Sequence, residues 1–209
     1  MLETLWQQLA ATGWAQWLGM STGIVGIWLS IRERAAAWPF FLVCYSAYVY
    51  LSFRAGYFAF TGMNVVFIGI SVYGWLAWTR ANREGAPEPL RIGRLSPRGW
   101  LLLLGALAVA SFGVGRVLQM TGEASLPYVD ALAACSGLTA QFLLSRKYIE
   151  NWFFWIVSDY LYLILMGGTG DLPSAVLFGT FILLALKGWL EWRPRSGSGS
   201  SSASERDKT

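Results

Sequence analysis

Long apolar runs alternate along most of the chain with short segments that contain charged residues, glycine or proline. A helix that crosses a lipid bilayer needs about 20 predominantly apolar residues. We predict seven such helices, over residues 14–33, 37–54, 58–79, 98–118, 127–146, 149–167 and 171–192. Pro39 and Pro173 fall in the first turns of the second and seventh runs, where a missing backbone N–H is harmless. Both prolines therefore mark helix starts.

Two polar segments divide the chain. Residues 81–99 are rich in Arg, Pro and Gly, and the C-terminal residues are mostly Ser and Gly, too polar to bury the surface that folding needs. The predicted regions are a first three-helix unit (1–79), a linker loop with a central helix (80–126), a second three-helix unit (127–193) and a disordered cytoplasmic tail (194–209). The N-terminus lacks the basic start and the cleavage site of a signal peptide, so we expect the first helix to remain.

Composition supports a membrane protein and disfavours an enzyme. Of the 209 residues, 55% are hydrophobic and only 13% are charged, with a mean hydropathy of +0.45. The chain has no histidine, the commonest general base and metal ligand. Cys44 and Cys135 lie in separate apolar runs, where we expect small buried residues and no metal site. We therefore predict no catalytic residues, no metal and no cofactor.

Basic residues predict the orientation of the chain in the membrane. The net charge is +4, but Lys and Arg lie in short loops and not along one helical stripe, which argues against a nucleic-acid partner. With seven helices, Arg54 and Arg116 fall on one side of the membrane. The other side receives Arg32, Arg34, Arg80, Arg83, Arg91, Arg94, Arg98, Arg146, Lys147, Arg193, Arg195, Arg206 and Lys208, with Lys187 nearby. Because positive loops stay in the cytoplasm, we expect the N-terminus outside and the C-terminus inside.

The sequence also contains an internal repeat. Residues 18–79 align without a gap to residues 132–193 at an offset of 114, and roughly a quarter of the positions are identical. The motif GWLAW at 74–78 falls on GWLEW at 188–192. Each copy holds three helices, and one helix joins them. We therefore predict an all-α integral membrane protein built from two parallel three-helix repeats, the 3+1+3 arrangement of SWEET-type carriers, with a substrate site between the halves.

The sixth run carries the strongest candidate for a functional residue. Trp152, Trp155 and Asp159 are spaced to share one helix face, and the first copy has Trp38, Phe41 and Tyr45 at those positions. An ionisable group at spanning depth costs a few kcal/mol unless it faces the protein interior, and such groups usually line a pathway. A structural pair between Asp159 and a neighbouring helix is the alternative. Trp38 and Trp152, beside loops, are interpreted first as interface anchors, and Trp155 could serve either purpose.

Further polar residues complete the predicted substrate site. Asn64, Tyr73, Gln141 and Asn151 could offer hydrogen bonds, and Tyr48 is included from the repeat. Isolated amides also hold membrane helices together, by about 0.6 kcal/mol per contact. Each of these residues could therefore bind substrate or join helices, and the sequence leaves both alternatives open. Lys187 is expected to extend toward the cytoplasmic surface, and the matched Arg32 and Arg146 to set the topology.

The segments Asn64–Trp78 and Arg146–Asp159, with the closing GWLEWR, resemble the PnuC-type vitamin transporters over nearly the whole chain. The resemblance implies a homotrimer that takes up nicotinamide riboside across the bacterial inner membrane by facilitated diffusion. A cytoplasmic kinase would trap the imported vitamin by phosphorylation. It also implies that Asn64, Asn151, Trp152, Trp155 and Asp159 contribute to the substrate site. Relatives carry thiamine or riboflavin instead, and Gly179, Thr180 and Lys187 in the seventh run leave the choice of vitamin open.

Two other classes of function are weaker. A membrane enzyme or receptor-like protein would lack the usual catalytic groups, since the chain has no His and no G-x-S-x-G motif. A proton or ion pathway would need a chain of ionisable groups, and Asp159 has no second acid at its depth. No G-x-x-x-x-G-K-[ST] loop is present, which argues against coupling to ATP. Alternating access without an energy source is the leading hypothesis.

Overall fold

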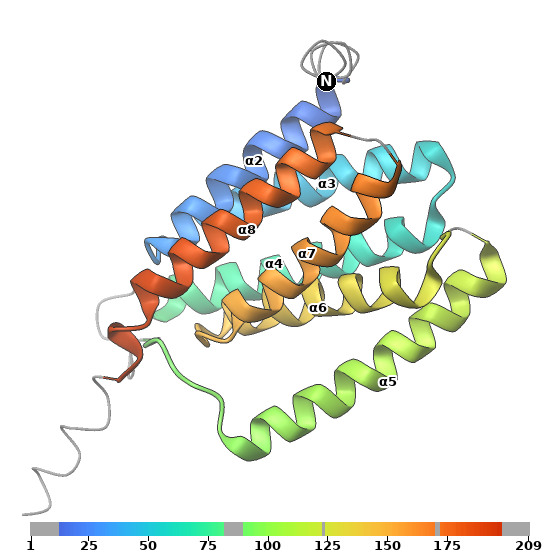
Figure 1. The fold of residues 1–209 in the computed structure, drawn as a ribbon. Coiled ribbons are helices and arrows are strands. Elements are labelled where there is room, and N and C mark those ends of the chain that lie inside the picture. Colours follow the sequence, from blue (N-terminus) through green and yellow to red (C-terminus); the bar gives the residue numbers. More distant parts are fainter. Residues whose placement is uncertain (1–12, 82–89, 123, 170–171, 198–209) are drawn as a thin grey trace, which may run out of the picture.

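The computed structural model describes residues 13–81, 90–122, 124–169 and 172–197 as seven α-helices and one short 3-10 helix (Figure 1). The helices are α2 (Trp14–Ile31), α3 (Ala37–Ala55), α4 (Phe58–Ala81), α5 (Pro97–Thr121), α6 (Pro127–Ser145), α7 (Asn151–Thr169) and α8 (Leu172–Trp192), followed by η1 (Arg195–Gly197). All seven predicted helices are present, with bounds that differ by three residues at most. The predicted disorder of the tail concerns residues that lie mostly outside the described ranges.

Local sequence explains where the helices begin and end. Pro39 and Pro173 lie in the first turns of α3 and α8, as predicted. The Ser96 hydroxyl accepts a hydrogen bond from the Gly99 N–H and caps α5. Gly56, which follows α3, has a left-handed backbone with φ of 80°, the conformation that ends many helices and that glycine adopts without strain.

Six of the helices form a closed ring. Neighbours in contact are α2 with α3, α3 with α4, α4 with α6, α6 with α7, α7 with α8, and α8 with α2. Helix α5 joins the two sets of three helices and packs mainly along α6, outside the ring, while its Trp100 also contacts Phe153 and Phe154 of α7 (Figure 1). We call α2–α4 the first triplet and α6–α8 the second triplet. The ring thus closes through two contacts between triplets, α4 with α6 and α8 with α2.

Each triplet buries a pair of tryptophans at the end where α2 and α6 finish. In the first triplet the rings of Trp38 and Trp78 meet edge to face with centroids 5.4 Å apart. In the second, Trp152 and Trp192 meet in the same way at 5.3 Å. Trp38 and Trp152 are 0% and 1% exposed, so their interpretation as interface anchors is wrong. Glycines on the next helix make room for them: each indole packs against a helix backbone, Trp38 on Gly74 and Trp152 on Gly188.

One tryptophan of each pair also joins the two triplets. The Trp78 indole N–H donates to the carbonyl oxygen of Ser145 at the end of α6, at 3.1 Å. The Trp192 indole N–H donates to the carbonyl oxygen of Ile31 at the end of α2, at 2.9 Å. Both bonds satisfy carbonyls that a helix end leaves without an intrahelical partner. The two contacts therefore use equivalent positions in opposite triplets.

The outer surface of the ring is strongly apolar. Large hydrophobic side chains are exposed on every helix, most of all on α5, where Leu101 and Met120 are 76% and 80% exposed. By length and composition, the described part of the chain has three helices suited to cross a membrane, α4, α5 and α8. The helices α2, α3 and α6 have 18 or 19 residues, about 27–29 Å at 1.5 Å per residue. These lengths are close to the ~30 Å hydrocarbon core of a bilayer.

Candidate functional site

Inside the ring, four aromatic side chains from three helices form a continuous stack. Tyr45 of α3 and Phe67 of α4 lie nearly parallel with ring centroids 4.6 Å apart. Phe67 is followed by Trp155 of α7 at 6.3 Å, and Tyr45 by Phe41 at 6.2 Å. We call Phe41, Tyr45, Phe67 and Trp155 the aromatic stack. It crosses from the first triplet to the second, so a flat ring bound here would contact both.

Asp159 lies beside this stack. It is eight residues into α7, about 12 Å from the helix start, and only 3% exposed. The carboxyl is within electrostatic reach of the Tyr45 and Tyr162 hydroxyls. No described residue forms an ion pair with it or donates a hydrogen bond to it. Within the described ranges, Asp159 therefore lacks the partner on a neighbouring helix that a structural role would require.

A second polar group lies between α4 and α6. The Gln141 side chain is fully buried, and its Nε2 donates to the Ser71 hydroxyl at 3.1 Å. Ser71 in turn donates to the Phe67 carbonyl at 2.8 Å. The remaining amide oxygen, Gln141 Oε1, is buried without a partner among the described residues. This acceptor is available to a donor that the protein itself does not supply.

Asn151 offers another acceptor at the start of α7. Its Nδ2 donates to the Tyr148 carbonyl at 2.7 Å, while its Oδ1 is buried and has no partner in the described part of the chain. Trp152, next to it, is packed among residues of its own triplet, where its ring supports the helix pair α7–α8. Asn151 therefore remains a candidate contact, while Trp152 positions helices.

The other predicted residues lie in different places. Asn64 is buried in α4, but its Nδ2 bonds the Phe60 carbonyl one turn back at 2.8 Å. Tyr48 is half-buried and packs against Gly19 of α2. Tyr73 is 41% exposed on the outer surface and accepts a hydrogen bond from Arg146, which raises the pKa of that guanidinium. Tyr73 therefore does not join the site, because it faces away from the ring.

Sequence reasoning missed four residues of the site, Phe41, Tyr45, Phe67 and Ser71. Phe67 and Ser71 share a face of α4 with Asn64, at spacings of three and four residues, which is a signal that the sequence contains. In the sequence, Phe41 and Tyr45 are only the counterparts of Trp155 and Asp159 in the first copy of the repeat. Their places in the stack depend on the contact between α3 and α4, which the periodicity of the sequence does not show.

The polar groups of the site are confined to one side of the ring. Gln141, Ser71 and Asp159 come from α6, α4 and α7. The positions 114 residues away hold Ile27, Ala185 and Tyr45. Unpartnered acceptors beside an aromatic stack suit a flat ligand that brings hydrogen-bond donors and positive charge.

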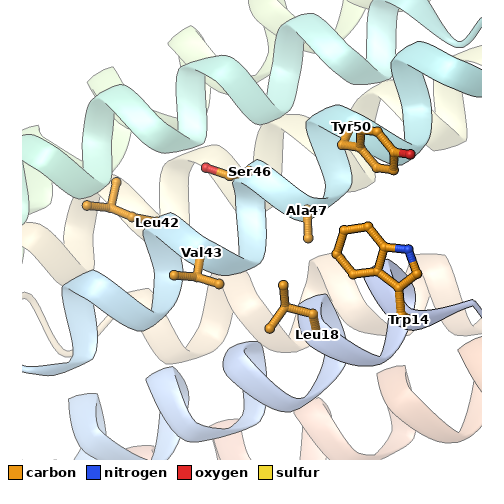
Figure 2. A pocket seen from close by; sticks show the side chains of 7 residues that line it. All are labelled: Trp14, Leu18, Leu42, Val43, Ser46, Ala47 and Tyr50. Carbon is orange, nitrogen blue, oxygen red and sulfur yellow. The ribbon is translucent and has the colours of Figure 1, made fainter.

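A groove on the outside of the ring is unrelated to this site. Figure 2 shows it between α2 and α3, lined by Trp14, Leu18, Leu42, Val43, Ser46, Ala47 and Tyr50. The exposure of Trp14 and Tyr50 places the groove on the outer surface. Its lining is almost entirely apolar, as expected for a surface that faces lipid.

Comparisons with known proteins agree with this architecture. Residues 13–194 match the family described as "Nicotinamide mononucleotide transporter". The chain is 24% identical to the nicotinamide riboside transporter PnuC of Escherichia coli K12, over 86% of this chain and 84% of the relative. It is 23% identical to the riboflavin/roseoflavin transporter RibM of Streptomyces davaonensis, over 88% and 86%. The crystal structure of the vitamin B3 transporter PnuC has the same fold, with a TM-score of 0.70 and 23% identity over 92% of this chain and 88% of that one.

The matched family covers all seven helices and both triplets. The relatives are transporters and not enzymes, in agreement with the absence of histidine from the sequence. The chain belongs to the nicotinamide mononucleotide transporter family and is a membrane transporter of the PnuC type.

Proposed function

We propose that the protein takes up nicotinamide riboside across the bacterial inner membrane by facilitated diffusion. The observation that carries this proposal is the buried Asp159 carboxyl, which has no partner among the described residues and lies beside the aromatic stack. An acid at this depth costs a few kcal/mol unless something compensates it. A cationic solute supplies that compensation while it is bound. Relatives named for the transport of this vitamin support the choice.

The chemistry of nicotinamide riboside matches the site group by group. Its pyridinium ring is flat and positively charged, so it would stack on Trp155 or Phe67 and gain about 0.5 to 2 kcal/mol of cation–π attraction. Its carboxamide and ribose hydroxyls are donors for the free oxygens of Gln141 and Asn151. In the structure, the protein's own rings stack on one another, so the ligand would replace one of these contacts.

The proposed scaffold is a duplicated bundle, with regions 1–79 and 127–193 as the two units and 80–126 as the connection. The reciprocal bonds of Trp78 and Trp192 support a two-fold relation between the triplets. Gly23 and Gly137 add to it, because each lies against a phenylalanine of the other triplet, Phe181 and Phe67 respectively. All seven helices would cross the membrane, and rocking of the triplets would expose the site to each side in turn.

The end with most basic residues would face the cytoplasm, with the N-terminus outside. In the described ranges this end carries Arg32, Arg34, Arg80, Arg91, Arg94, Arg98, Arg146, Lys147, Arg193 and Arg195, and the opposite end carries Arg54 and Arg116. Uptake would need no ion gradient, because a cytoplasmic kinase that phosphorylates the vitamin would keep it inside. The protein would work as a homotrimer, in line with the exposed apolar surface of α5.

Riboflavin is the second candidate substrate, and thiamine the third. A riboflavin/roseoflavin transporter matches this chain at 23% identity, close to the value for the nicotinamide riboside transporters. Riboflavin is flat and rich in donors but uncharged, whereas thiamine carries a positive thiazolium ring. Because Asp159 has no partner among the described residues, the site favours a positively charged vitamin over the uncharged riboflavin.

Uptake into proteoliposomes tests the proposal. We expect nicotinamide riboside to enter in preference to riboflavin and thiamine, without ATP or an imposed gradient, and Asp159→Ala to reduce the rate. Glu191→Gln, which removes an exposed acid of α8, is the matched control and should transport normally. Accumulation driven by a sodium or proton gradient would exclude facilitated diffusion, and uptake of riboflavin alone would assign the other vitamin.

A further inference from the structure

At the end of the bundle with most basic residues, an ion pair joins the two triplets. The Lys147 Nζ lies 2.8 Å from Glu33 Oε2, and Lys147 is only 6% exposed. Glu33 belongs to the loop between α2 and α3, and Lys147 to the loop between α6 and α7. The two residues are 114 positions apart in the sequence, so they are equivalent members of the two triplets.

The backbone at both residues is held in an unusual conformation. Glu33 and Lys147 each have a φ of 55°, and they are the non-glycine residues with positive φ in the described part of the chain. The left-handed region is disfavoured for residues with a Cβ atom, and Asn and Asp, rather than Glu and Lys, are the residues with side chains that adopt it most readily. Two equivalent strained turns therefore bring two opposite charges together across the triplets.

The pair is enclosed on several sides. The Lys147 ammonium lies 4.8 Å above the ring of Trp78, the residue whose indole bonds the Ser145 carbonyl. The other Glu33 oxygen accepts a hydrogen bond from Arg195 at 3.1 Å. A lysine as buried as Lys147 is stable only while it keeps an anion beside it. Separation of the triplets at this end must therefore break the ion pair and expose both charges.

The segment that connects the triplets is attached to the same loop. We call residues 90–96 the strap. Gly93 N–H donates to the Lys147 carbonyl, and Ile149 N–H donates to the Gly93 carbonyl, both at 3.0 Å. Leu95 N–H donates to Glu150 Oε1 at 3.0 Å. The strap therefore holds the backbone at Lys147 and Ile149 and the side chain of Glu150, but it does not bond Glu33.

We propose that Glu33 and Lys147 form the gate at this end of the pathway, closed in the structure described here. The proposal rests on the alternating access proposed above. When the two charged groups separate, water hydrates each of them, which offsets part of the cost of breaking the ion pair. Two apolar surfaces that separate would have no such compensation, so an ion pair is the contact that opens more easily. The indole bonds of Trp78 and Trp192 close the same end beneath the pair.

Access of a thiol reagent to the centre of the ring tests the gate. The probe is Ser71→Cys in a chain whose native cysteines are replaced, Cys44→Ala and Cys135→Ala, because Ser71 is fully buried between α4 and α6. A membrane-impermeant thiol reagent is added to vesicles of each orientation. With Glu33→Gln or Lys147→Gln, we expect labelling from the Glu33 side to be about 10-fold faster, which corresponds to a shift of the open population by about 1.4 kcal/mol.

Three controls separate a gate from a structural contact. Labelling from the opposite side should slow or stay constant in the gate variants, whereas a generally loosened fold would label faster from both sides. The exchange E33K with K147E should label more slowly than either neutral variant, although Arg195 limits the recovery. Glu191→Gln, which breaks the exposed pair with Lys187, should leave both rates unchanged.

The proposal would be overturned if Glu33→Gln and Lys147→Gln were labelled at the same rate as the parent protein. It would also be overturned if labelling became equally faster from both sides of the membrane. The assay requires no vitamin, so a normal result for the gate in a protein that fails to transport nicotinamide riboside would count against the substrate and not against the gate.

Discussion

Trp78 and Trp192, 114 residues apart in the sequence, each donate an indole hydrogen bond to the carbonyl at the end of a helix in the opposite triplet. Trp78 bonds Ser145 and Trp192 bonds Ile31, and these two acceptors are also 114 residues apart. Within its own triplet each indole meets a second buried tryptophan edge to face. The same local sequence thus forms the same contact twice, and each contact holds one triplet to the other.

Removal of either indole donor should destabilise the protein by a similar amount. In Trp78→Phe and Trp192→Phe, a buried carbonyl loses its partner, which typically costs roughly 1–3 kcal/mol in addition to the lost packing. The free energy of unfolding of the detergent-solubilised protein measures this cost. A loss in one variant and none in the other would show that the two contacts are not equivalent.

Glycines beneath the tryptophans should tolerate no side chain. A Cβ atom at Gly188 would lie 2.6 Å from the Trp152 ring, so Gly188→Ala must displace the indole or the helix. Overpacking of this kind usually costs about 1–3 kcal/mol. Gly179 lies on the same helix with open space around its Cα, so Gly179→Ala is the matched control and should be neutral or stabilising by about 0.5–1 kcal/mol. Thermal unfolding in detergent compares the two, and equal stabilities would contradict the packing seen at Gly188.

Gln141 should contribute to substrate binding through its free oxygen. Gln141→Leu removes that acceptor, and a hydrogen bond of about 1 kcal/mol corresponds to a loss of about 5-fold in affinity. Ser71→Ala removes only the group that holds the amide, so its effect should be smaller. Isothermal titration with nicotinamide riboside measures both. A larger loss in Ser71→Ala than in Gln141→Leu would indicate that Gln141 holds helices together and does not contact the substrate.

Sequence predicted the helices well, because each is a long apolar run bounded by proline, glycine or charge. It did not predict which face of a helix lies inside the ring. Membrane helices are apolar on the lipid side as well as inside, so Tyr73 looked as suitable as Asn64, although the structure places it on the surface. Asp159 was identifiable because a carboxyl in an apolar run stands out wherever it points.

Relations between distant segments explain the remaining misses. Trp38 and Trp152 lie near loops, which is typical of interface anchors, but the glycines that receive them are 36 residues further along. Lys147 was interpreted as a topology signal, and its partner Glu33 was not considered. The internal repeat contained the information, since Glu33 and Lys147 occupy equivalent positions with opposite charge. Their contact, however, depends on how the triplets pack.

The charge of the bound solute tests the account most directly. Nicotinamide riboside has an uncharged reduced form of nearly the same shape, and binding of both can be measured on the purified protein and on Asp159→Asn. If the buried carboxylate selects a flat cation, the unaltered protein binds the oxidised form at least about 10-fold more tightly, a difference of about 1.4 kcal/mol. Asp159→Asn should lose most of this preference and keep only the smaller part that the cation–π contact with Trp155 or Phe67 supplies. Equal binding by the unaltered protein, or a preference for the cation that is undiminished in Asp159→Asn, would contradict the role assigned to Asp159.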